Sequence, residues 1–158
     1  MGETHHANIQ SQQMLAIHTS QGSTYWSFMP EDRLFVISHN GQLSLEHMKD
    51  NYMKIASDHS LPRQLNVLHD CRNAQFLFDI SKVNVLVEAF QHMSLCFEQV
   101  MWADLHNQPK TTAYGFLFAN LLSNTRDQYR LFSSEDEAIN WLTHKQMLPI
   151  KQLKFKTE

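Results

Sequence analysis

The chain has 158 residues, of which 42% are hydrophobic and 18% are charged, and its formal net charge is −3. This length and apolar content predict one globular domain that can bury a core, and they exclude a largely disordered chain. The slightly negative charge argues against a general nucleic-acid binder, which needs a basic face. No apolar run reaches the length of a membrane span, and the polar N-terminus lacks the apolar core of a signal peptide. We therefore expect a cytoplasmic protein.

The two cysteines and ten histidines raise the question of a metal site. Cys71 and Cys96 lack metal-type spacing, and two thiols in a chain of this length do not make a disulfide scaffold. The histidines form no HxH or HExxH pattern. The sequence therefore predicts no metal site and no cofactor.

The first third of the chain predicts an antiparallel meander behind a disordered leader at residues 1–11. Short extended segments are expected at 14–18, 24–28 and 34–38, with turn residues between them. Asn40-Gly41 predicts a further turn directly after the third segment.

The rest of the chain alternates helices and strands, which predicts parallel strands joined by crossover helices. Apolar residues at steps of three and four predict a helix that starts after Ser44 and stops before Pro62. The later elements are expected as a strand at 65–68, a helix at 83–100, a strand at 101–105, a helix at 112–122, a strand at 128–132 and a helix at 134–143. The single domain is expected to cover residues 12–143, followed by a basic tail at 144–158.

The closing unit at residues 129–142 is the most informative stretch. A short strand leads into a helix, and Ser134 with Glu137 three residues later is a capping box, in which the two side chains bind free amides at the helix start. Phe132 and Trp141 are expected to be buried.

Two stretches, Leu65-Asn-Val-Leu-His-Asp-Cys-Arg72 and the closing unit, resemble the STAS/SEC14-like family of small bacterial α/β domains, often described as SpoIIAA-like. The resemblance covers Arg33 to Leu142. It implies a single α/β domain in which N-terminal antiparallel strands lead into a mixed, mostly parallel sheet with four helices packed on it. It implies no particular activity, because members of this group are largely uncharacterised.

The resemblance also offers one regulatory residue. Ser81, in Asp79-Ile80-Ser81-Lys82, matches the phospho-acceptor serine of phosphorylatable members of the family. Ile80 and Lys82 depart from the serine and glycine of that pattern, and the glycine normally lets a kinase approach the backbone closely. We therefore expect Ser81 to be the N-cap of the following helix, with the phospho-acceptor role as the alternative.

The densest reactive cluster is His69-Asp-Cys-Arg72, at the end of an apolar strand, where open α/β sheets place ligands. A Cys71 nucleophile with a His69 base is conceivable, but no glycine-rich turn for an oxyanion accompanies it. We expect instead that Asp70 and Arg72 hold a turn and that Cys71 is a small buried residue. No catalytic residue is therefore predicted.

A second polar loop contains His106, Lys110 and Thr111. Lys110 beside free helix amides is suited to an anion, although an ordinary capped turn explains the loop equally well. If both loops lie at one edge of a parallel sheet, they form a ligand site there. The predicted ligand-binding residues are Asp70, Arg72, His106, Lys110 and Thr111.

The helices expected at 83–100 and 112–122 are apolar on more than one face, which is typical of helices buried on two sides. A homodimer interface explains this best, and a groove for an apolar ligand is the alternative. The sequence therefore predicts a non-enzymatic interaction or regulatory module that forms a homodimer. The alternative function is a binder of a small apolar or anionic ligand at the carboxyl edge of the sheet.

Overall fold

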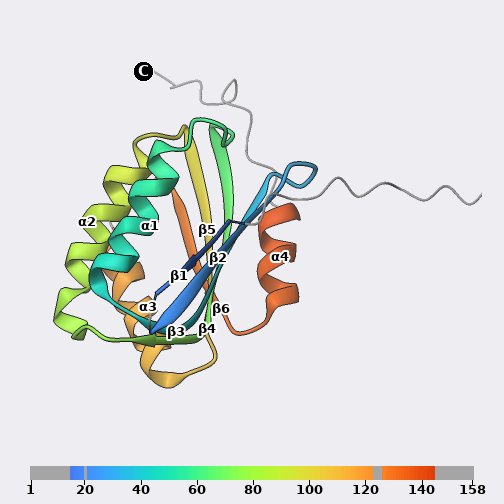
Figure 1. The fold of residues 1–158 in the computed structure, drawn as a ribbon. Coiled ribbons are helices and arrows are strands. Elements are labelled where there is room, and N and C mark those ends of the chain that lie inside the picture. The colour runs from blue at the N-terminus through green and yellow to red at the C-terminus, as the bar shows by residue number, and fades with distance from the viewer. Residues whose placement is uncertain (1–14, 20, 123–125, 145–158) are drawn as a thin grey trace, which may run out of the picture.

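A computed structural model describes residues 15–19, 21–122 and 126–144, so most of the predicted leader and tail lie outside the described residues. The chain forms an α/β structure with a six-stranded mixed sheet, whose strand order β1-β2-β3-β4-β5-β6 follows the sequence. Helices α1, α2 and α3 cover one face of the sheet and α4 covers the other (Figure 1). The predicted fold class is confirmed. Among the described residues, no helix is both long and apolar enough to cross a bilayer.

The N-terminal strands form the predicted antiparallel meander: β1 (Leu15–His18), β2 (Gly22–Met29) and β3 (Leu34–Leu43). The predicted turn at Asn40-Gly41 is wrong, because β3 continues through both residues. Gly41 has a φ of 90°, and a Cβ there would lie 2.7 Å from the carbonyl oxygen of Gln21. The glycine therefore marks a close approach inside the sheet.

Three parallel strands complete the sheet: β4 (Gln64–Phe76), β5 (Gln99–Leu105) and β6 (Gln128–Phe132). The helices are α1 (Leu45–Ser57), α2 (Val83–Ser94), α3 (Pro109–Leu121) and α4 (Glu135–His144). The predicted helix at 83–100 is too long, because Val100 pairs with Leu65 in the sheet. Strand pairing thus outweighs the apolar periodicity at that point.

Strand β4 is much longer than predicted, and it runs straight through the expected turn at Asp70 to Arg72. A β-bulge lies there, because the pairing with β3 shifts between Ser38–Asp70 and Asn40–Asn73. One extra residue in β4 reverses the alternation of side chains. Cys71 and Ala74 consequently join the same buried cluster although they are three residues apart.

The start of α2 differs from prediction. A short 3₁₀ turn, η1 (Ile80–Lys82), precedes the helix, and the side chain of Asp79 accepts a hydrogen bond from the Ser81 amide at 2.8 Å. The prediction that Ser81 caps the helix is therefore wrong: Asp79 is the N-cap of η1, and Ser81 is exposed.

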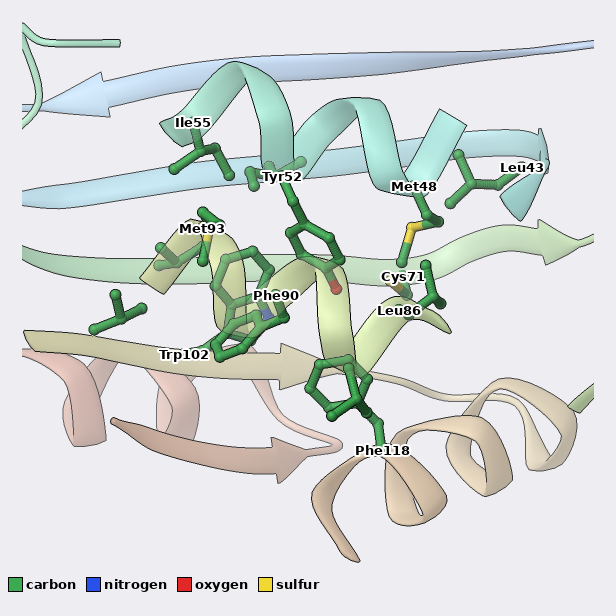
Figure 2. Close-up of a cluster of buried hydrophobic side chains, with 14 of the residues drawn as sticks. Leu43, Met48, Tyr52, Ile55, Cys71, Leu86, Phe90, Met93, Trp102 and Phe118 are labelled. Carbon is green, nitrogen blue, oxygen red and sulfur yellow. The ribbon is translucent and has the colours of Figure 1, made fainter. Parts of the chain in front are cut away.

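The main core lies between the sheet and helices α1 to α3. At its centre, the ring of Phe90 meets Tyr52, Trp102 and Phe118 at centroid distances of 5.2 to 5.7 Å (Figure 2). A smaller core lies under α4 and includes Leu68, Phe132 and Leu142.

The closing unit forms as predicted in most respects. Ser134 accepts a hydrogen bond from the Glu137 amide at 3.4 Å, and Phe132 is buried. Trp141 is only half-buried, so the expectation that it is buried is wrong. It packs beside Phe132 at the margin of the smaller core, with ring centroids 5.6 Å apart.

Candidate functional site

A row of polar side chains crosses the face of the sheet that helices α1, α2 and α3 cover. Thr24 on β2 pairs with His39 on β3, and His69 on β4 pairs with Asp104 on β5. All four residues are buried, with exposed fractions between 1% and 6%. Buried polar groups carry a large desolvation cost unless they bind one another. We call these four residues the histidine–aspartate row.

Hydrogen bonds join the whole row. Thr24 Oγ1 lies 2.9 Å from His39 Nδ1, and His39 Nε2 lies 2.8 Å from His69 Nε2. His69 Nδ1 lies 2.8 Å from Asp104 Oδ1. At the other end, the half-buried His47 places its Nε2 3.0 Å from Thr24 Oγ1. The row therefore connects a side chain near the surface with a carboxylate in the core.

Asp104 is the charged end of the row. The Tyr129 hydroxyl donates to its Oδ2, and His106 Nε2 lies 3.0 Å from the same oxygen. Burial alone would raise the pKa of Asp104, but His106 and His69 outweigh it and hold the pKa well below its ordinary value. Burial likewise opposes charge on His106, yet Asp104 raises the pKa of that imidazole. Asp104 is thus an ionised carboxylate in the core.

The charge of Asp104 sets the direction of the hydrogen bonds. An ionised carboxylate only accepts, so His69 donates from Nδ1. When His69 is neutral, its Nε2 accepts from His39 Nε2, and His39 Nδ1 then accepts from the Thr24 hydroxyl. Burial and the neighbouring His69 and His47 keep the pKa of His39 well below its ordinary value, which agrees with a neutral ring.

Cys71 lies against the row but is not an activated nucleophile. Its Sγ is 3.6 Å from both ring nitrogens of His69, so it lies beside the ring and not in line with one nitrogen. The side chain is fully buried, and burial and the charges of Asp104 and Asp70 raise the pKa of its thiol well above the ordinary value. Reactive cysteines have the opposite environment.

Helix α3 closes over Asp104 and His106 and leaves a cavity of about 20 Å³, lined in part by His69 and Tyr129. That is room for about one water molecule. Among the described residues, neither ring nitrogen of the buried His106 has a well-aligned hydrogen bond, although Nε2 is within ion-pair distance of Asp104. A Cβ at Gly115 would lie 3.2 Å from His106 Nε2, so the glycine lets α3 pack this closely.

The structure does not bring the predicted ligand-binding residues together. Arg72 Nη2 lies 2.7 Å from Asp70 Oδ2 and 2.8 Å from Glu135 Oε2, on the side of the sheet that α4 covers. These two carboxylates already neutralise Arg72. The remaining three residues lie elsewhere: His106 beside Asp104, Lys110 with its Nζ 3.3 Å from the Phe76 carbonyl, and buried Thr111 donating to the Gln108 carbonyl.

The histidine–aspartate row is not apparent from the sequence. His39, His69 and Asp104 are 30 and 35 positions apart, so no local spacing links them. One signal was present, because His69 and Asp104 interrupt apolar runs at positions that strand alternation turns towards the core.

No family model and no curated protein matches the chain. One similar solved structure is that of an uncharacterised protein of the DUF3478 family with a SpoIIAA-like fold from Shewanella loihica PV-4. It has 14% sequence identity and a TM-score of 0.45, and the match covers 86% of this chain and 97% of that one.

Proposed function

We propose that this protein is a non-enzymatic interaction or regulatory module that acts as a homodimer. The observation that carries the proposal is an exposed apolar surface beside α3. Leu77, Ile80 and Phe116 are 51%, 39% and 59% exposed. Clustered exposed apolar side chains are typical of protein–protein contact sites. We define the α3 patch as Leu77, Ile80, Ala113 and Phe116.

The α3 patch borders a groove. Leu77, Ile80 and Ala113 line an open groove of about 640 Å³ together with Tyr114. Phe116 follows Ala113 by three residues in α3, which puts both on one side of the helix. An aromatic side chain next to such a groove is a suitable anchor for the matching groove of a partner.

The charges around the groove favour a second copy of this chain as the partner. Asp79 and Lys110 both line the groove and have opposite charges. In a two-fold dimer, the same surface of both copies meets, so Asp79 of each copy can approach Lys110 of the other.

The buried row supports a non-enzymatic role. The thiol of Cys71 is fully buried, and the cavity beside Asp104 has space for about one water molecule. A substrate would need α3 to move away before it reached these groups.

Sedimentation equilibrium of the wild type and two variants tests the dimer. We expect a dimer for the wild type at micromolar concentration and monomers for Leu77→Asp and Phe116→Asp. Leu95→Asp is the matched control, since Leu95 is 71% exposed at the end of α2 and outside the patch. A monomeric wild type, or equal behaviour of all three variants, would contradict the proposal.

A small apolar or anionic ligand in the same groove is the second candidate. The groove combines the rings of Phe76, Phe78 and Tyr114 with Lys110, which suits an apolar body with a negative group. A monomeric wild type that enhances the emission of an anilinonaphthalene sulfonate, with the enhancement lost in Leu77→Asp and Lys110→Gln, would favour this function over the dimer.

A further inference from the structure

We infer that His39, His69 and Cys71 form a site for a transition-metal ion of the Zn²⁺ class. This inference is independent of the proposed dimer. The ligand atoms that the three residues offer all lie within 4.8 Å of one another, and all three side chains are buried. Imidazole nitrogens and a thiolate are the ligands that Zn²⁺ takes in proteins.

Two of the distances among the three ligand atoms can be compared with those around a tetrahedral ion. Bond lengths of about 2.0 Å to nitrogen and 2.3 Å to sulfur put ligand nitrogens about 3.3 Å apart and nitrogen and sulfur about 3.6 Å apart. His69 Nε2 and Cys71 Sγ are already 3.6 Å apart, and the two Nε2 atoms are 2.8 Å apart. Because Sγ lies beside the His69 ring, metal binding requires the ring to turn towards the sulfur and the two Nε2 atoms to move apart.

Outer contacts hold both histidines in the orientation that a metal requires. His69 binds Asp104 through Nδ1, and His39 binds Thr24 through Nδ1, so each Nε2 points towards the other ring. Metal-ligating histidines almost always use their second nitrogen in this way. Cys71 lies two residues after His69 in β4, so strand alternation places both side chains on the same face.

Loading the site with Zn²⁺ changes the protonation of Cys71 and of His39. Binding breaks the S–H bond of Cys71 and releases one proton. His39 and His69 both stay neutral, and the ring proton of His39 moves from Nε2 to Nδ1, where it is donated to the Thr24 oxygen.

A second grouping of Cys71, Asp104 and His106 satisfies the same distance limit. We favour the His39, His69 and Cys71 set because Asp104 already binds His69 and Tyr129, which leaves it suited to the outer shell. With three protein ligands, one position of a tetrahedral ion remains for a water molecule. His69 also helps to line the one-water cavity beside Asp104.

Titration of the chelator-treated full chain with Co²⁺ tests the site, because a thiolate bound to Co²⁺ gives a charge-transfer absorption that histidine alone does not give. We expect one equivalent of Co²⁺ to produce this absorption together with the intense visible bands of tetrahedral cobalt, and one equivalent of Zn²⁺ to abolish both. Cys71→Ser should remove the charge-transfer absorption. The exposed Cys96 provides the control, since Cys96→Ser should leave the spectrum unchanged. A His5→Gln, His6→Gln double variant is a second control. It removes the adjacent histidines near the N-terminus and should leave the spectrum unchanged.

Two further variants keep the inference testable if Cys71→Ser does not fold. His39→Gln removes one ligand, and Thr24→Val removes only its outer contact. We expect Thr24→Val to weaken Co²⁺ binding by about tenfold or more while the absorption spectrum persists, as is usual for an outer-shell partner. Absence of the charge-transfer absorption in the wild type, its persistence in a folded Cys71→Ser variant, or its loss in Cys96→Ser would overturn the inference.

Discussion

At the residue scale, Asp104 determines the chemistry of the core. One carboxylate accepts from His69 and Tyr129 and faces His106, and its charge sets the hydrogen-bond direction along the whole row. Breaking a buried charged pair by removing one partner is far more damaging than losing a surface pair, because the remaining partners stay buried without a counterpart.

Asp104→Asn should therefore lower the free energy of unfolding by about 3 kcal/mol, measured by urea denaturation in the presence of a chelator. Glu98→Gln is the control, since Glu98 forms a largely exposed pair with Arg63 at 3.4 Å and should change stability by less than about 1 kcal/mol. Equal losses in both variants would show that the buried position of Asp104 has no special importance.

Asp79 gives a prediction about pH at the same scale. Its hydrogen bonds from Ser81 lower the pKa of the exposed Asp79 carboxyl below its ordinary value. A lowered folded pKa adds stability above the unfolded pKa, and this contribution is lost as pH falls through the folded pKa. Wild type should exceed Asp79→Asn in stability at neutral pH, and the difference should disappear in acid. Urea unfolding at a series of pH values measures it, and a difference that does not change with pH would contradict the assignment.

At the element scale, two departures from regular strands build the site. The bulge in β4 turns Cys71 and Ala74 to the same face, and the extension of β3 through Gly41 keeps His39 inside the sheet. A turn at Asn40 would end β3 next to His39, and a regular β4 would turn Ala74 away from the face that Cys71 occupies. Strand irregularities next to functional groups are common for this reason.

Gly41→Ala tests the second departure. A methyl group there meets the Gln21 carbonyl oxygen at 2.7 Å, and the φ of 90° is strained for any other residue. We expect a loss of about 2 kcal/mol in the free energy of unfolding, measured by thermal or urea denaturation. Gln42→Ala, at the exposed neighbouring position, should cost little. A stable Gly41→Ala protein would mean that the chain at this point relaxes easily.

At the scale of the whole molecule, the aromatic centre under α1 to α3 holds the helices on the sheet. Phe90 is fully buried and joins α2 to Tyr52 of α1 and Phe118 of α3. Phe90→Ala should lower the free energy of unfolding by about 3 to 5 kcal/mol, because it removes apolar contacts and leaves a cavity. Calorimetry measures this loss, with Leu95→Ala as the exposed control. A loss below about 1 kcal/mol would mean that the core collapses readily into the space.

The sequence by itself determined the fold class, because apolar periodicity, caps and turn residues act locally. Ser44 and Ser134 begin their helices as predicted, since a side-chain oxygen bound to a nearby amide needs no distant partner. The predicted ends of elements were wrong where strand pairing sets them, as at Val100 and Asn40. Interstrand hydrogen bonds form with residues far away in the sequence, so local patterns do not show them.

Only the tertiary structure decided the site. His39, His69 and Asp104 show no common motif, and they meet because neighbouring strands place side chains of the same face about 5 Å apart. Arg72 and His106, predicted to act together, have different partners in the fold: Arg72 pairs with Glu135 of α4, whereas His106 lies beside the buried Asp104. The register of the strands and the bulge in β4 determine which side chains meet. Both depend on hydrogen bonds between strands across the whole sheet.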